Sequence, residues 1–566
     1  MTQSFASTFA GPTSKERKYD RQLRLWAASG QQALEDSRVL LINSDGAVDA
    51  DNASNTGVTG VEALKNLVLP GIGGFMIVDP ATVTEADLGV NFFLSADSLG
   101  KPRAQETCNY LRELNPDVVG LWASQPISQL FAREDGFLAY YRLVIATGPM
   151  RQSTLQTISQ RTSELSIPLI YARSVGFYCC MSLQLPIAFP VVETHLDPQS
   201  MEDLRLTNPW PELLAAAKKV ENLEALDDHQ HGHVPYLLIL LHYLEKWKEA
   251  HNGMYPKNYK EKTEFKEMIR GRARINNPEG GEENFDEAVA AVLKSINPWS
   301  LSSGLRDVFE MDQCCNLTAT SDNFWIVVRA VKAFYQRHGV LPLPGSLPDM
   351  KAQSADYISL QNVYKSKARQ DFEEVAAHVR FLEEQLGLDR LIAPIPEKEI
   401  EIFCKNAAHI KVIKGRELPF LDADAPQGET VKAIRNSLRN AESLIPIFIS
   451  LRALDALVTE FQETTPPSTS SSFFDDSGNW QRAVSRIVHA LQVNDSEPLD
   501  DEAQANIQNA VAETCRAGTG ELHNISSMAG GFVAQEALKV LTKQYVPLDN
   551  TFVFDGVRSR GEMFRL

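Results

Sequence analysis

The pattern of apolar and polar positions is clearest between residues 39 and 79. Residues 39–42 form a short apolar run, which predicts a buried strand. After a polar loop, apolar residues recur at helical spacing over residues 61–68, and a Pro-Gly pair ends that helix. A second apolar run, residues 75–78, ends at Asp79. The stretch therefore predicts a strand–helix–strand unit with the order found at the start of nucleotide-binding folds.

The alternation of strand and helix continues to about residue 185, which predicts a parallel, doubly wound sheet. Long helical patterns then dominate, until a helix with small residues and the strand-like run TFVFDG close the chain. We therefore predict an α/β fold in which residues 1–185 and 505–566 form one discontinuous domain. Residues 186–504 are expected to be a mostly helical insertion. The Pro- and Ser-rich segment 464–479 is typical of a flexible break within it.

Length, charge and cysteine content narrow the class of protein. A chain of 566 residues exceeds the size of one core. The net charge of -18 argues against nucleic acid as the main ligand, and no apolar run is long enough to span a membrane. Seven cysteines without a CxxC pair predict neither a disulfide framework nor a zinc site. We expect a cytoplasmic and nuclear protein.

The loop before the predicted helix has few of the features of a phosphate-binding loop. Such a loop needs glycines so that backbone N–H groups can approach the anion, but only Gly57 and Gly60 lie near the helix start. The polar segment 45–54 also makes the loop long. We favour a structural loop without nucleotide. Asp79 is left with two readings, a ligand for a ribose hydroxyl or an ordinary cap at a strand end.

Several longer motifs carry a resemblance to a known family. KYDRQLRLW, ALKNLVLPGIGGFMIVD, LGKPRAQ and AGGFVAQEALKVLTKQ resemble the adenylating enzymes that activate ubiquitin-like modifiers. VVETHLDPQSMEDLRL and YISLQNVYKSKARQDF extend the resemblance to the regulatory subunits of the heterodimeric enzymes of neddylation. The resemblance implies a Rossmann-like pseudo-adenylation domain of the ThiF/MoeB type. It also implies that the insertion is similar to a catalytic-cysteine domain without the cysteine.

Positions that the family uses to bind ATP differ in this chain. Where catalytic members carry an arginine in an Asn-x-x-Arg-Gln element, this sequence has Val90, and where they carry a lysine it has Arg103. The strand that ends at Ala146 runs into Thr147 instead of a magnesium-binding aspartate. Losing the arginine and the carboxylate removes a phosphate contact and a metal ligand. The resemblance therefore implies that this chain binds no cofactor or metal, and that ATP and Mg²⁺ bind in a partner.

One family feature is retained near the start of the chain. Residues 18–38 predict two short helices separated at Ser29 and Gly30, and Arg21 lies in the first of them. In the family an arginine at this place reaches the ATP site of the other subunit, as an arginine finger does. Arg24, one turn further on, is a second candidate for that contact. The alternative is an exposed helix arginine with only local partners.

Cysteine and histidine clusters are not expected to carry chemistry. The family's catalytic cysteine precedes a threonine, and no cysteine here does. Cys314 and Cys315 follow acidic residues, a setting that raises the pKa of a thiol. His229, His231 and His233 could chelate a metal, but their polar segment favours a surface loop.

The resemblance implies a regulatory subunit that pairs with a catalytic subunit. That pair would adenylate the C-terminus of the Rub-type modifier of neddylation, form a thioester and pass the modifier to a conjugating enzyme. Two alternatives belong to other classes: a stand-alone ATP-dependent adenylating enzyme and a nicotinamide-dependent dehydrogenase. The dehydrogenase needs an intact G-x-G-x-x-G after Ile42, which the sequence lacks.

Overall fold

A computed structural model describes residues 13–46, 57–196, 203–220, 222–275, 281–387, 393–420, 428–464, 476–492 and 499–566. The chain divides into two compact units. Unit 1 comprises residues 1–189 and 413–566, and unit 2 comprises residues 190–412. A helical unit is thus inserted into a discontinuous one.

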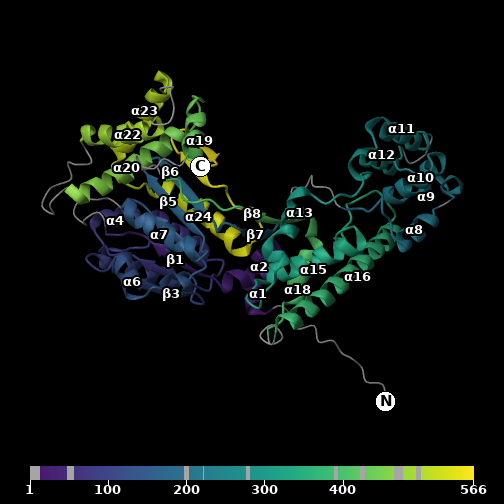
Figure 1. The fold of residues 1–566 in the computed structure, drawn as a ribbon, viewed down its shortest axis with the longest axis horizontal. Helices are drawn as coiled ribbons and strands as arrows, with labels where there is room; N and C mark the ends of the chain where they lie inside the picture. Colours follow the sequence, from purple (N-terminus) through teal and green to yellow (C-terminus); the bar gives the residue numbers. More distant parts are fainter. Residues whose placement is uncertain are drawn as a thin grey trace, which may run out of the picture. The chain divides into compact units, whose positions relative to one another are not determined.

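Unit 1 (Figure 1) is built on an eight-stranded sheet. Its strands follow the order β10-β9-β6-β5-β4-β1-β2-β3. The strands β3, β2, β1, β4 and β5 are parallel, as predicted, while β6, β9 and β10 add an antiparallel side. The apolar run at residues 39–42 is buried because β1 lies in the middle of the sheet. The strands are β1 (Arg38–Ile42), β2 (Gly74–Val78), β3 (Val119–Ala123), β4 (Leu143–Thr147), β5 (Leu169–Val175), β6 (Tyr178–Gln184), β9 (Thr551–Asp555) and β10 (Arg560–Phe564).

Helices cover both faces of the sheet. The helix predicted over residues 61–68 is α3 (Val58–Val68). It packs against α24 (His523–Thr542) from the other end of the sequence. The two helices approach closely at Gly530, because this residue has no side chain. An added Cβ there would lie only 2.6 Å from the Cβ of Glu62. The small residues of α24 therefore serve a helix–helix contact. The remaining helices of the first 189 residues are α1 (Ser14–Lys18), α2 (Asp20–Glu35), α4 (Glu85–Val90), α5 (Arg103–Leu114), α6 (Ile127–Arg133) and α7 (Gln152–Glu164).

The break in the N-terminal helix lies earlier than predicted. Trp26 and Ala27 leave helical geometry, and Ala27 has a φ of 56°, so the helix is not interrupted at Ser29 and Gly30. A Cβ at Gly30 would lie 2.7 Å from the Cβ of Trp26. The glycine is thus needed for the approach of Trp26, not as the breaking point.

The predicted end of the insertion at residue 504 is wrong. A cluster of buried apolar side chains joins the helices after residue 428 to Val175, Tyr178, Val553 and Phe564 of the sheet. These helices therefore belong to unit 1, and the insertion ends at residue 412. A helical pattern shows that one face is buried but not against which surface. The helices are α19 (Gly428–Leu438), α20 (Ile445–Thr464), α22 (Ser477–Gln492) and α23 (Asp501–Ala517).

Two predicted loops fall largely on residues that the structure does not describe. Of the segment 464–479, residues 465–475 lie outside the described residues, and of the segment 45–54, residues 47–54 do.

Unit 2 is mostly helical, as predicted for the inserted segment. Its long helix α16 (Ser354–Leu386) contributes residues to two separate apolar cores. The strands β7 (Phe189–Val192) and β8 (Ile410–Ile413) form a two-stranded sheet where the chain enters and leaves the unit. The other helices are α8 (Pro211–Lys218), α9 (Asp228–His231), α10 (Tyr236–Ala250), α11 (Tyr259–Arg270), α12 (Glu283–Ser295), α13 (Ser303–Glu310), α14 (Asp312–Cys315), α15 (Asn323–His338) and α18 (Glu397–Lys405).

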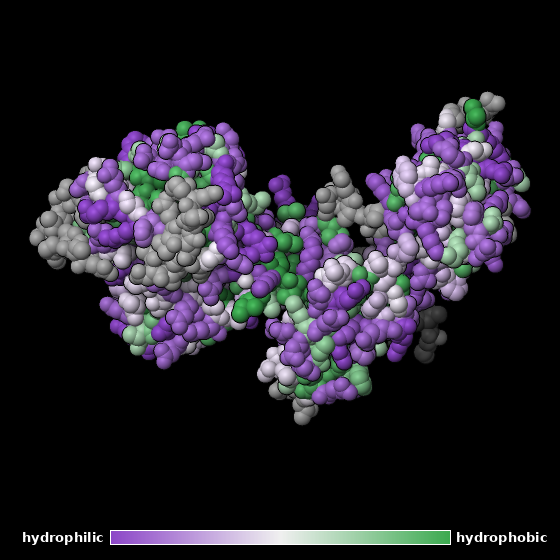
Figure 2. All heavy atoms as spheres, turned by 45° about the horizontal axis from the view of Figure 1, so that its top comes forward, coloured by the Kyte–Doolittle hydropathy of each residue, from purple (hydrophilic) through white to green (hydrophobic). Residues whose placement is uncertain are grey.

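None of the helices described is both long and apolar enough to cross a bilayer. The face drawn in Figure 2 is mostly hydrophilic, with hydrophobic residues gathered in smaller patches.

Candidate functional site

The carboxyl ends of the central strands are joined by their own side chains. Asn43 follows β1, Asp79 follows β2 and Thr147 ends β4. The Nδ2 of Asn43 donates to the Oδ2 of Asp79 at 3.0 Å, and the hydroxyl of Thr147 lies 3.1 Å from the Oδ1 of Asn43. All three residues are buried. This edge is where open α/β sheets bind ligands, but here its polar groups bind each other.

The N-terminus of α3 has a protein carboxylate where a nucleotide-binding fold would place a phosphate. The backbone N–H groups of Val58 and Thr59 donate to the two oxygens of Glu521 at 2.9 and 3.1 Å. The hydroxyl of Thr59 donates to the same carboxylate at 2.7 Å. The unpaired N–H groups and dipole of a helix N-terminus favour an anion. Glu521 supplies that anion from within the chain.

Gly57 and Gly60 permit the close approach of Asn43. A Cβ at Gly57 would lie 1.9 Å from the Nδ2 of Asn43, and one at Gly60 would lie 2.5 Å from its Oδ1. Gly57 also has a φ of 60° at the N-cap of α3, a conformation that favours glycine. The glycines are therefore explained by packing of the side chain that closes the loop.

Arg103 is the centre of a buried ion-pair network. Its Nε and Nη2 donate to the two oxygens of Asp79 at 2.8 and 3.1 Å, and its Nη1 donates to Asp87 at 2.9 Å. Burial alone would lower the pKa of Arg103, but the two carboxylates raise it above its usual value. Asp79 also accepts from the backbone N–H of Ala81 at 3.1 Å. Asp79 thus caps the strand end through Ala81, as one of its two interpretations expects, and both oxygens of its carboxylate also accept hydrogen bonds from Arg103.

Val90 and the N-terminal arginines lie outside this network. The carbonyl of Val90, the last residue of α4, accepts from the Nδ1 of His523 at 2.8 Å. Arg24 is exposed and pairs with Asp20 at 2.9 Å. Arg21 is exposed on α2 and makes no ion pair with any other described residue. The structure therefore leaves the Arg21 side chain available at the surface of this chain.

Burial makes three of the cysteines unsuited to nucleophilic chemistry. Burial raises the pKa of Cys108 to about 11 and that of Cys180 to about 12. The pKa of Cys314 is raised to about 11 by burial, so the predicted direction holds, but the predicted acidic cause is wrong because Lys332 acts in the opposite direction. Cys315 is exposed, with its sulfur 3.4 Å from the Nζ of Lys332.

The histidines at positions 229, 231 and 233 do not share one set of contacts. His231 is buried and its Nδ1 lies 2.7 Å from Glu282, whereas the Nδ1 of His233 lies 2.7 Å from the carbonyl of His229. No group of three or more potential metal ligands occurs among the residues described.

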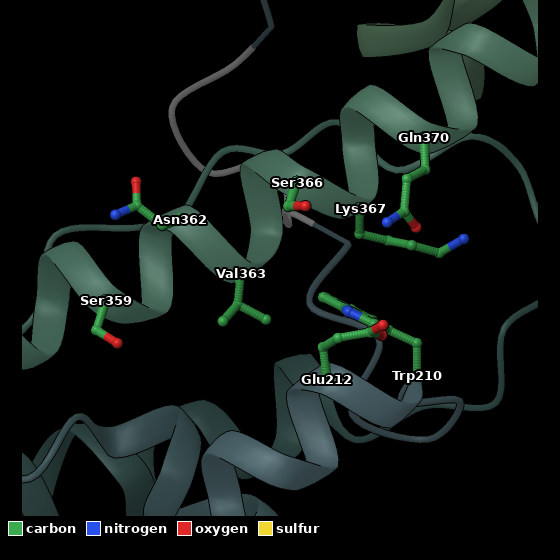
Figure 3. A pocket seen from close by; sticks show the side chains of 8 residues that line it. All are labelled: Trp210, Glu212, Ser359, Asn362, Val363, Ser366, Lys367 and Gln370. Atoms are coloured by element: carbon green, nitrogen blue, oxygen red, sulfur yellow. The ribbon is translucent and has the colours of Figure 1, made fainter.

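A pocket of about 350 Å³ lies between α8 and α16 of unit 2. Figure 3 shows Val363 pointing from α16 toward Glu212 at the start of α8, whereas Lys367 extends along α16 above Trp210. The Nζ of Lys367 is bound to Asp371 at 2.6 Å. The pocket therefore combines one aromatic ring with polar and charged side chains, and its lysine is already paired with a carboxylate.

An apolar surface lies at the antiparallel side of unit 1. On β9, Phe552 and Phe554 face away from the buried Val553, and Met563 of β10 pairs with Phe552 and so shares its face. Phe532 of α24 stacks edge-on against Phe552 with the ring centroids 4.8 Å apart. The aromatic side chains are half-buried and Met563 is 72% exposed. We call these four side chains the aromatic face.

Comparison with known proteins shows which family this chain belongs to. The model of the ThiF family matches residues 19–566. The NEDD8-activating enzyme E1 regulatory subunit of Danio rerio is 36% identical over 562 residues, which cover 98% of this chain and 99% of the relative. The chain belongs to the ThiF family, in the group of NEDD8-activating enzyme E1 regulatory subunits. The proteins of the same name from Xenopus laevis and Drosophila melanogaster are 36% and 34% identical, and each match covers 98% of this chain.

Membership in the ThiF family confirms the resemblance that the motifs indicated. It does not test the individual site residues. The structure brings together Asp79, Arg103, Thr147, Gly57 and Gly60 of the predicted set, and it leaves Val90, Arg21 and Arg24 apart from them. Sequence reasoning missed Asn43, Asp87 and Glu521. The polar Asn43 directly after an apolar strand was a usable signal, whereas Glu521 is too distant in sequence to have given one.

Proposed function

We propose that this chain is the regulatory subunit of an activating enzyme for the ubiquitin-like modifier of neddylation, and that it has no adenylation activity alone. The observation that carries the proposal is Glu521, whose carboxylate occupies the N-terminus of α3. A nucleotide phosphate at that helix would meet a buried negative charge. Asp79 is likewise bound to Arg103.

ATP and Mg²⁺ then belong to a catalytic partner subunit, and this chain contributes Arg21 in trans. In support, Arg21 lies exposed without an ion-pair partner among the described residues. A guanidinium that reaches the phosphates across a subunit interface stabilises the charge of the transition state. Arg24 is held by Asp20, so we assign it the smaller part.

We place the catalytic subunit against the aromatic face of unit 1. Half-exposed aromatic side chains and methionine are enriched in the cores of protein interfaces, and charged residues are depleted there. Phe552, Phe554 and Met563 offer such a surface next to Phe532. The relatives are named regulatory subunits, which supports a partner subunit for this chain as well.

The complex would adenylate the C-terminus of the modifier, carry it as a thioester on the partner and pass it to a conjugating enzyme, for transfer to targets such as cullins. This chain would help to position the modifier. The raised pKa of Cys108 and of Cys180 makes both poor carriers of a thioester. We expect the complex in the cytoplasm and the nucleus.

The proposal is tested by modifier-dependent ATP–pyrophosphate exchange. The purified chain should give none, and the chain together with a catalytic subunit that carries a complete Gly-rich ATP loop should give exchange. Exchange by the chain alone would instead support a stand-alone adenylating enzyme. Saturable binding of a nicotinamide dinucleotide would support the dehydrogenase. Failure of the two chains to associate would contradict the regulatory role.

A further inference from the structure

A cluster of buried charges joins β5 to α20 in unit 1. The side chains of Arg173, Arg452 and Asp455 are 2%, 9% and 8% exposed. Asp455 accepts from the Nη1 of Arg173, from the Nη1 of Arg452 at 3.3 Å and from the hydroxyl of Tyr171 at 3.0 Å. One carboxylate thus serves three donors.

The charges of this cluster do not balance. Arg173 and Arg452 are both cationic, and Asp455 is the carboxylate that they share. Tyr171 supplies no negative charge, since burial, followed by the nearby Asp455, raises the pKa of its hydroxyl above the usual value. A buried charge without compensation costs several kcal/mol. The cluster therefore favours one further anion.

Unused hydrogen-bond donors accompany the surplus charge. The Nε and Nη2 of Arg173 are buried and have no hydrogen-bond partner in the described part of the chain. The guanidinium of Arg452 lies over the rings of Tyr171 and Phe448, 5.3 and 5.2 Å from their centroids, which fixes its position. The unused donors thus belong to Arg173, while Arg452 is positioned by its two ring contacts and its ion pair with Asp455.

Arg452 and Asp455 line a small cavity, together with Gln152 and the apolar side chains of Met150, Leu155 and Ile487. Its volume is about 30 Å³. A single water needs roughly 10–15 Å³ by the same measure. The cavity therefore has room for one monatomic anion or a pair of waters, and it is too small for sulfate, phosphate or a nucleotide.

We propose that this cavity binds one small monovalent inorganic anion of the size of chloride, held by Arg452 and balanced by the surplus charge that Arg173 adds. The anion would neutralise the cluster at the point where α20 meets β5. It would thereby stabilise the packing of the C-terminal helices of unit 1 on the sheet.

The test measures thermal unfolding of the full chain, in complex with its catalytic subunit, in chloride and in gluconate. Ionic strength is kept at about 0.15 M, so that screening is equal. Chloride should raise the midpoint saturably, on the order of 2 °C. Arg452→Leu should abolish the difference between the salts. Arg486→Leu, which removes an exposed arginine paired with Glu460 on the surface, should retain it.

Bromide provides a direct measurement if Arg452→Leu does not fold. Crystals of the unaltered complex in bromide at the same ionic strength should show anomalous scattering within hydrogen-bond distance of the Arg452 guanidinium. Equal midpoints in the two salts, water alone at that position, or an adventitious ion only, present at molar bromide, would each overturn the proposal.

Discussion

At the scale of single residues, side chains of this protein fill the positions where a nucleotide-binding fold would hold its ligand. The N-terminus of α3 still meets an anion, which is the carboxylate of Glu521. Asp79 still binds a polar partner, which is Arg103. These contacts are internal, so they are formed when the chain folds and need no ligand.

The hydrogen bonds of Glu521 at the N-terminus of α3 predict the effect of substituting this residue. Glu521→Ala should lower the free energy of unfolding by roughly 2–4 kcal/mol, because it leaves the buried N–H groups of Val58 and Thr59 without an acceptor. Chemical denaturation monitored by tryptophan fluorescence measures the loss. The surface pair Glu513–Arg516 offers the control, since Glu513→Ala should cost less than 1 kcal/mol. Equal losses would mean that the Glu521 carboxylate is not a stabilising cap.

Arg21 makes a separate prediction about catalysis in the complex. Arg21→Ala should leave heterodimer formation intact and slow modifier adenylation by roughly 10- to 100-fold, the effect of losing one or two charge-assisted hydrogen bonds. Pyrophosphate exchange at saturating and at limiting ATP measures the rate. Arg369→Ala alters an exposed arginine of unit 2 and should have no effect. A wild-type rate for Arg21→Ala at both concentrations would exclude the trans contact.

At the scale of elements, the packing of α24 on α3 is the contact that joins the two ends of the sequence. Gly530 lies against the backbone of α3, where an added Cβ would come within 2.8 Å of the nitrogen of Ala63. Nothing lies within 4 Å of the corresponding position at Gly531. Two adjacent glycines of one helix thus have different roles.

This difference can be measured with matched substitutions. Gly530→Ala should destabilise unit 1 by roughly 1–3 kcal/mol, because the helices must separate to admit the methyl group. Gly531→Ala should be neutral or stabilising by up to about 1 kcal/mol, since alanine favours the helix. Urea unfolding of the two variants compares them directly, and the reverse order would contradict the close approach of α24 and α3.

How far the elements could be predicted follows from where their partners lie. The strand–helix–strand unit after residue 38 was predictable because its apolar pattern is local. The strand β9 was also predicted, from the run TFVFDG. Its antiparallel pairing, the strand β10 and the packing of α20 on the sheet were not, because an amphipathic pattern does not show which surface it packs against. In the site, Gly57 and Gly60 were found but their role was not, since it depends on the rotamer of Asn43.

At the scale of the whole molecule, the insertion begins and ends at neighbouring strands. The pairing of β7 with β8 brings the two connections together, and the backbone N–H of Gly415 donates to the carbonyl of Ile187 at 3.3 Å. Each unit has apolar clusters of its own. Unit 1 therefore does not need unit 2 for its core.

This organisation predicts that unit 2 can be removed. A chain in which a short Gly-Ser linker replaces residues 190–412 should fold, unfold cooperatively and still associate with the catalytic subunit through the aromatic face. Calorimetry and size-exclusion chromatography measure the two properties. Phe552→Asp in the same chain should abolish association while preserving the thermal transition, and association that survives this change would place the interface elsewhere.

The bond between Glu521 and Val58 also has a consequence for the order of events on the ribosome. The two residues are 463 positions apart. At synthesis rates of about 5–20 residues per second, roughly 20–90 s pass between the synthesis of Val58 in α3 and that of Glu521, whose carboxylate caps this helix. β1 to β5 are made early, whereas α24, β9 and β10 come last. Unit 1 can thus complete its fold only after residue 521 has been made, and a nascent chain halted before that residue leaves the N–H groups of Val58 and Thr59 without their carboxylate.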